Sequence, residues 1–154
     1  MSNDFRLNSY LARIGFGGTV GPDFATLAAI HAAHIHAIPF ENFDPLLRRP
    51  VKLDLASVQA KLVDGRRGGY CFEQNVLLKA ALEAIGFDVT GLAARVRWMS
   101  PPTSPLGPKT HMLQRLIYPM ERTLPTSGLA SACSIFHCDL RPMSSSVRQW
   151  VHIG

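Results

Sequence analysis

The chain of 154 residues is short of cysteines, of charged side chains and of long apolar runs. Its three cysteines are few and odd in number, which argues against a disulfide scaffold and leaves room for a reactive thiol. No apolar run approaches the roughly 20 residues that a membrane-spanning helix needs. Residues 1–20 also lack the basic-then-apolar order of a signal peptide. We therefore expect a cytoplasmic protein with no membrane partner.

Charge of one sign is not concentrated anywhere in the chain. Lys and Arg number 16 against 11 Asp and Glu, a formal net charge of +5 at pH 7, and these residues are scattered. This pattern suits anionic small molecules better than nucleic acid, which we do not expect as a partner. With 47% hydrophobic residues the chain can bury a core, and its length suits one domain or slightly more.

Helical periodicity fills the first half of the chain. Apolar residues at helical spacing predict a helix over 5–14 closed by glycines, a second over 24–37 stopped by Pro39, a short third capped by Asp54, and an amphipathic fourth that begins at Cys71 or Phe72 and ends before Gly86. The chain contains no internal sequence repeat.

The period changes after Gly86. Residues 87–98 alternate as a strand does, with one slip between Gly91 and Leu92, and a proline-rich loop over 100–109 precedes another strand that starts near Thr110. The expected fold class is α+β: an N-terminal helical bundle followed by the start of a β-barrel or sheet. We place a helical domain at 1–86, the start of a β-domain at 87–118 and an atypical tail at 119–154. No element is expected at Trp150–Gly154.

The segment Arg66–Asn75 (RRGGYCFEQN) carries the strongest chemical signal. Two glycines allow a tight turn, and Cys71 follows at the first turn of a helix. The free N–H groups there, together with Arg66 and Arg67, are expected to favour a thiolate and so a nucleophile. The alternative is that Cys71 is a small buried apolar residue, as many lone cysteines are.

A cysteine nucleophile needs a base, and His111 is the candidate because a strand beside a helix N-terminus can bring its imidazole to the Cys71 sulfur. His31 and His34 have a metal-like spacing but no acidic or cysteine partner nearby in sequence, so we expect polar or partly buried helix residues. Residues 133–138 hold Cys, His and Cys without a fourth ligand. We therefore expect no metal site.

Three motifs together resemble the arylamine N-acetyltransferase family. Arg67–Asn75 (RGGYCFEQN) is similar to its active-site signature, Ile38–Phe43 (IPFENF) to the segment after its second helix, and Thr110–Leu113 (THML) to the segment with its catalytic histidine. The resemblance covers about residues 4 to 113 and implies a cysteine-protease-like arrangement. Cys71 and His111 would be two members of a Cys-His-Asp triad, and acetyl-CoA would be the donor.

The resemblance implies a ping-pong reaction in which Cys71 takes the acetyl group and passes it to an arylamine or arylhydrazine. Phe40 and Phe72 are candidates to line an aromatic acceptor pocket, with a place in the core as the alternative. Glu41 and Arg67 are expected to pair and support the loop that presents Cys71.

The chain departs from the family after the histidine. The position of the family's aspartate holds Thr126, and the only later acid is Asp139. Codons for Arg122–Ala130 can be chosen so that a shifted frame spells Tyr-Leu-Ala-Asp-Val-Gly-Phe-Gly, which is similar to the family's aspartate strand. We hypothesise that the tail is translated out of frame. Two alternatives stay open: an inactive frameshifted fragment, or a cysteine hydrolase of protease or transglutaminase type.

Overall fold

The computed structural model describes residues 5–96, 101, 103–117, 130–134, 137–138 and 151–153. Its helices are α1 (Leu7–Ile14), α2 (Phe24–Ala37), α3 (Phe43–Leu46), α4 (Leu55–Gln59), the π-helical turn η1 (Ala60–Asp64) and α5 (Cys71–Ile85). Its strands are β1 (Asp88–Val96), β2 (His111–Ile117), β3 (Ala130–Ser134), β4 (His137–Cys138) and β5 (Val151–Ile153). In this described part no helix is long and apolar enough to cross a membrane.

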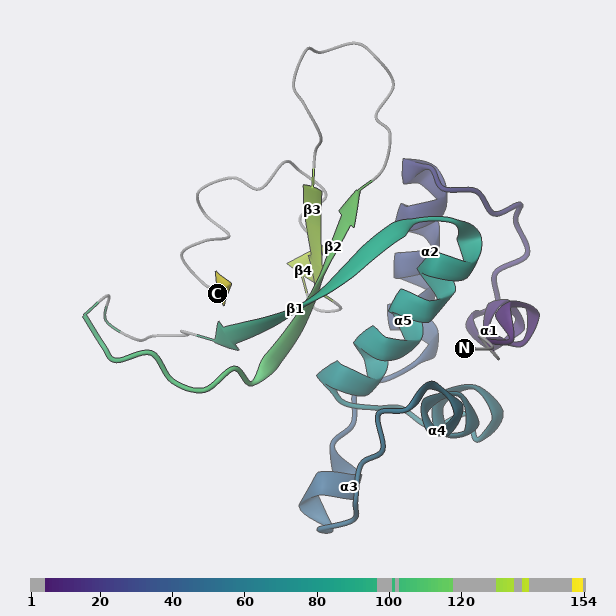
Figure 1. Ribbon diagram of the computed structural model, residues 1–154. Coiled ribbons are helices and arrows are strands. Elements are labelled where there is room, and N and C mark those ends of the chain that lie inside the picture. Colours follow the sequence, from purple (N-terminus) through teal and green to yellow (C-terminus); the bar gives the residue numbers. More distant parts are fainter. Residues whose placement is uncertain are drawn as a thin grey trace, which may run out of the picture.

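Helix α5 is the central element. It contacts β1 and β2 on one side and α1, α2 and α4 on the other, and Figure 1 shows it between the sheet and the remaining helices. Its fully buried leucines (Leu77, Leu78 and Leu82) join the core with residues from α1, α2 and η1. Whatever sits at the start of α5 is therefore held by both the helical part and the sheet.

The helix ends follow the sequence signals closely. The Asp23 carboxylate accepts from the Thr26 backbone N–H at 2.8 Å and starts α2, and Asp54 accepts from Ser57 N–H at 2.9 Å and starts α4. Gly15 (φ 69°) and Gly86 (φ 110°) end α1 and α5 in the left-handed conformation that glycine adopts without strain. The short helix α3 was not expected.

All four described strand pairings in the sheet are antiparallel. Its strand order is β4-β3-β2-β1-β5. The described strands form an open sheet with β4 and β5 outermost, and a closed barrel is not seen among them. The slip expected in the alternation of β1 appears in its burial, where the buried positions change from Phe87 and Val89 to Ala94. It involves no bulge, because pairing runs continuously from Asp88 opposite Ile117 to Ala94 opposite His111. Val89 and Ala94 are both buried although, five positions apart, they lie on opposite faces of the strand.

The tail contains strands that the sequence did not predict. Val151–Ile153 pairs with β1, and Ala130–Ser134 pairs with β2. These are long-range pairings with strand edges, which local periodicity does not signal. Thr126, Asp139 and the remainder of the tail lie outside the described residues, as does Trp98 at the end of the first predicted strand.

A buried polar chain joins three helices. His34 on α2 is fully buried. Its Nδ1 lies 2.9 Å from the Tyr10 hydroxyl, and its Nε2 lies 2.7 Å from Gln74 Oε1. Since the amide oxygen only accepts, His34 carries its proton on Nε2 and accepts from Tyr10 at Nδ1. His34 thus links α1, α2 and α5 through hydrogen bonds in the core. Among the described residues there is no group of three side chains that could hold a metal ion.

Acidification from pH 6.5 to 4 is expected to destabilise the protein through His34. Burial lowers the pKa of His34 from 6.5 to about 4. The unfolded chain therefore takes up the proton first, so the stability contributed by neutral His34 is complete above pH 6.5 and is lost as pH falls towards 4. A shift of this size corresponds to about 3 kcal/mol.

Urea unfolding across this pH range measures the effect, with His34→Leu as the control that cannot titrate. The difference in unfolding free energy between wild type and variant should shrink as the pH falls. Parallel losses in the two proteins would show that the titration belongs to another group.

Candidate active site

The glycine loop before α5 approaches another segment of the chain too closely for a side chain. Gly69 N–H donates to Pro39 O at 3.2 Å, and Glu41 N–H donates to Gly69 O at 3.1 Å, which makes a parallel bridge between Phe40 and Gly69. A Cβ built on Gly68 would lie 2.2 Å from the Pro39 carbonyl oxygen. Glycine is therefore required at 68 by contact rather than by its backbone angles, and the bridge fixes where α5 begins.

Cys71 is the first residue of α5 and is partly buried. Its Sγ lies 3.9 Å from the Thr110 carbonyl oxygen, the residue before β2. One turn later, the Asn75 amide donates to Cys71 O at 2.8 Å and to Met112 O at 3.2 Å. These contacts place the start of β2, which His111 begins, beside the N-terminus of α5.

The pKa values of Cys71 and His111 shift in the directions opposite to those of the expected ion pair. Burial raises the pKa of the Cys71 thiol, and backbone hydrogen bonds from Phe72, Met112 and Cys71 itself oppose this shift in part. Burial also lowers the pKa of His111. Both directions favour the neutral forms of the Cys71 thiol and the His111 imidazole.

The expectation that Arg66 and Arg67 favour a Cys71 thiolate is wrong. The guanidinium of Arg67 is bound to Glu41 and Asp44, and neither arginine is among the causes of the Cys71 pKa shift. The charge of Arg67 is thus neutralised by Glu41 and Asp44, since a carboxylate is a stronger partner for a guanidinium than a half-buried thiol.

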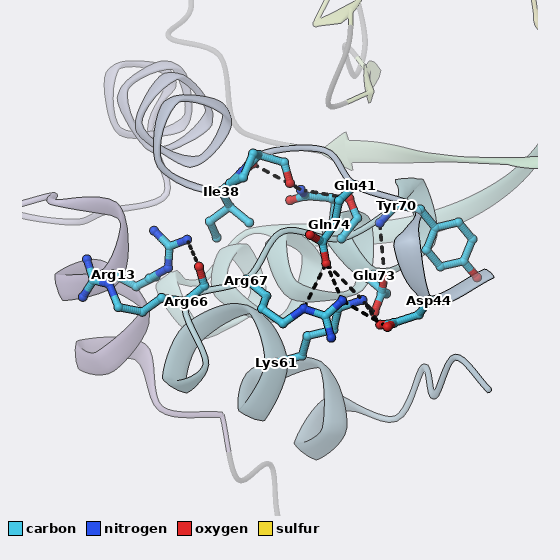
Figure 2. Close-up of polar contacts among 12 residues, drawn as sticks. Arg13, Ile38, Glu41, Asp44, Lys61, Arg66, Arg67, Tyr70, Glu73 and Gln74 are labelled. Atoms are coloured by element: carbon cyan, nitrogen blue, oxygen red, sulfur yellow. Dashed lines mark hydrogen bonds and ion pairs between the residues drawn. The ribbon is translucent and has the colours of Figure 1, made fainter. Parts of the chain in front are cut away.

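The predicted pairing of Glu41 with Arg67 is confirmed. Arg67 donates to Glu41 Oε1 from Nη2 at 2.7 Å and from Nε at 3.1 Å. The pair belongs to a larger ion-pair network of Glu41, Asp44, Lys61, Arg67 and Glu73, which Figure 2 shows between the glycine loop and the helices around it. Sequence reasoning missed the other three members, because they come from α3, η1 and α5.

Lys61 is the centre of the ion-pair network. Its Nζ lies 2.7 Å from both Asp44 Oδ2 and Glu73 Oε1. Burial alone would lower the pKa of Lys61, but the hydrogen bonds to Asp44 and Glu73 outweigh it and the pKa is raised. The other carboxylate oxygen of Glu73 accepts from Tyr70 N–H at 3.1 Å, so this network holds the residue just before Cys71.

The two candidate pocket residues differ in environment. Phe40 is 50% exposed, which excludes a place in the core. Phe72 is partly buried and its ring centroid lies 5.5 Å from that of Tyr70. Phe40 belongs to the bridge with Gly69, two residues before Cys71. Phe72 therefore follows Cys71 directly in the chain, and the backbone of Phe40 lies beside the loop that leads into Cys71.

Comparison with known proteins agrees with this geometry. The model of a family described as N-acetyltransferase matches residues 23–122, so the helical part, the glycine loop and β2 together define a protein of the N-acetyltransferase class. The arylamine N-acetyltransferase of Mycolicibacterium smegmatis is 51% identical over 114 residues, which is 73% of this chain and 42% of that protein. The Escherichia coli K12 protein of the same name is 48% identical over 107 residues, 70% of this chain and 37% of that protein.

Solved structures give the same result. An M. smegmatis arylamine N-acetyltransferase structure has a TM-score of 0.75 at 45% identity, covering 85% of this chain and 46% of that one. The Mycobacterium marinum enzyme in complex with CoA has a TM-score of 0.72 at 38% identity, covering 84% of this chain and 46% of that one. The chain belongs to the arylamine N-acetyltransferase family, and it spans less than half the length of these relatives.

Proposed function

We propose that this chain transfers an acetyl group from acetyl-CoA to an arylamine or arylhydrazine through a thioester on Cys71. The observation that carries the proposal is the position of Cys71 at the first residue of α5, beside the start of the strand that holds His111. Family membership supports the donor, since a relative was solved in complex with CoA. Phe40, bridged to Gly69, and Phe72, next to Cys71 in the chain, would be the aromatic neighbours of a flat acceptor.

The reaction follows from these groups in two steps. In the first, His111 accepts the thiol proton, Sγ of Cys71 bonds to the acetyl carbon, and the carbon–sulfur bond to CoA breaks as the CoA sulfur takes that proton. In the second, the amine nitrogen bonds to the acetyl carbon, the Cys71 thioester breaks, and the amine proton returns to Cys71 through His111. Backbone N–H groups at the start of α5 would stabilise the oxyanion in each step.

Incubation with acetyl-CoA alone tests the proposal. We expect the intact protein to gain the mass of one acetyl group, located on Cys71 by peptide mapping, and to lose it when an arylamine is added. Cys71→Ala should abolish the gain, and Cys133→Ser with Cys138→Ser should retain it. Amide hydrolysis without CoA would instead favour a cysteine hydrolase, and a folded chain that is never acetylated would favour an inactive fragment.

We also propose that transfer by this chain is slow. The neutral thiol and neutral imidazole that burial favours leave little thiolate at pH 7. Alkylation of Cys71 by iodoacetamide should therefore rise roughly tenfold per pH unit through neutrality, because only the thiolate reacts. The rate is followed by mass spectrometry of the Cys71 peptide. A rate that is already flat in mildly acidic solution would show a thiolate–imidazolium pair and contradict this expectation.

The out-of-frame tail remains our proposal for the missing aspartate. It is supported by the family match, which ends at residue 122, where the shifted codons begin. Asp139 is a poor substitute because it lies in the same tail. A fresh read of the gene from codon 105 onward tests the proposal. An insertion or deletion near codons 113–122 relative to the present sequence supports it, whereas an unchanged read means that the natural protein carries Thr126.

A further inference from the structure

Gln74 is the buried polar residue of α5 with the most hydrogen bonds to other segments. It is fully buried. Its amide nitrogen donates to Ile38 O at 3.2 Å, Pro39 O at 2.9 Å and Gly69 O at 3.2 Å, while its Oε1 accepts from His34. Figure 2 shows Gln74 close to Ile38 and Glu41. Three of its partners are backbone carbonyls of the two segments that meet at the Phe40–Gly69 bridge.

The bridge itself is short and depends on those carbonyls. Only two backbone hydrogen bonds join the segments there: Gly69 N–H to Pro39 O, and Glu41 N–H to Gly69 O. Gln74 donates to the same two oxygens. The Gln74 amide thus clamps the bridge, because Pro39 O and Gly69 O each accept one hydrogen bond from a backbone N–H of the bridge and one from Gln74 on α5.

The clamp holds the backbone on both sides of Phe40. The Phe40 side chain itself is half exposed. Its backbone neighbours, Pro39 and Glu41, are the residues that the bridge and Gln74 hold. Cys71, in contrast, is also held through α5 and through Asn75. Loss of the Gln74 hydrogen bonds would therefore move Phe40 relative to Cys71 and leave Cys71 beside β2.

We propose that Gln74 is a positioning residue that holds Phe40 beside Cys71 and so orients the aromatic acceptor for attack on the Cys71 thioester. The inference rests on the proposed function. It assigns the amide of Gln74 to the second half of the reaction, because formation of the thioester needs Cys71 and His111 but not Phe40.

The experiment compares two variants that break the same buried polar chain at different points. Gln74→Met removes the hydrogen bonds to the three carbonyls, while His34→Leu removes the histidine and leaves those hydrogen bonds in place. Gln74→Glu serves as a second test variant, because a carboxylate accepts from His34 but cannot donate to carbonyls. Rapid-mixing mass spectrometry gives the rate of thioester formation with acetyl-CoA and, separately, its decay on addition of p-anisidine.

We expect Gln74→Met and Gln74→Glu to slow the p-anisidine step at least about tenfold, because a misplacement near 1 Å can cost roughly 100-fold. Thioester formation should stay within about twofold of wild type, and His34→Leu should leave both rates near wild type once corrected for the folded fraction. A purely structural role would slow both steps together, or would affect His34→Leu as much as Gln74→Met. Either result overturns the proposal.

Hydrogen exchange gives a readout that does not require activity. The N–H groups of Gly69 and Glu41, the two donors of the bridge, should lose protection in Gln74→Met and retain it in His34→Leu. If the wild-type chain forms no thioester, the proposed function fails, and these two amides still decide whether Gln74 holds the bridge. Equal protection in all variants would overturn the positioning role.

Discussion

Gly68→Ala is expected to destabilise the protein by about 3 kcal/mol or more, the upper end of the cost of overpacking. The new Cβ would lie 2.2 Å from the Pro39 carbonyl oxygen, closer than any real contact of this kind. Because that oxygen belongs to the backbone, no side-chain rotation relieves the clash, and the two segments must separate. Their separation breaks the bridge between Phe40 and Gly69 and frees the start of α5.

Urea unfolding measures this cost, and two other glycines provide matched controls. A Cβ at Gly17 or Gly107 would meet nothing within 4 Å. Both alanine variants should therefore stay within about 0.5 kcal/mol of wild type, as surface substitutions usually do. A Gly68→Ala protein as stable as these controls would mean that the close approach to Pro39 is not required for folding.

Lys61→Met is expected to cost about 3 kcal/mol, the range for removing one partner of a buried ion pair. The side chain of Glu73 is only 3% exposed, and Lys61 is the cation that binds it. Asp44 also loses its ion pair with Lys61, but it keeps the one with Arg67 and so remains compensated. The cost is thus mainly that of an uncompensated buried carboxylate at the first turn of α5.

A rescue variant separates this cause from lost packing. Glu73→Gln in the Lys61→Met background removes the stranded charge and keeps an amide oxygen that can accept from Tyr70 N–H, so we expect most of the stability to return. Lys79→Met is the control, since Lys79 pairs with Glu83 on the exposed face of α5 and should change stability by less than about 1 kcal/mol. Failure of Glu73→Gln to restore stability would indicate that the Lys61 stem, rather than its charge, matters.

The sequence predicts those parts of this fold that depend on neighbouring residues. The bounds of α2 and α5 follow from Asp23, Pro39 and Gly86, which act within a turn of the helix end. The four-residue helix α3 is too short for a period to appear, so it was missed. The strands of the tail were missed for a different reason, because pairing with β1 or β2 requires partners far along the chain.

The candidate site shows the same division. Cys71 and the Glu41–Arg67 pair could be found from motifs, and the structure has that pair in place. The effect of Arg67 on Cys71 could not be predicted from motifs, because it depends on where Asp44 and Glu41 lie in space. Nor does the sequence indicate that His34, Gln74 and Tyr10 form one hydrogen-bonded chain, since these residues are separated by 24 and 40 positions.

The central place of α5 has a consequence for synthesis on the ribosome. Every helix that packs on α5 precedes it in the chain, whereas both strands that cover its other side follow it. A nascent chain that has emerged as far as Gly86 can therefore close its helical core around α5 and complete the bridge at Gly69, because domains fold as the N-terminal part appears. At that stage the side of α5 that faces the sheet is still exposed to solvent. The strand that carries His111 reaches the start of α5 only after the chain has been extended through β2, so Cys71 is set in its helix before His111 is brought near it.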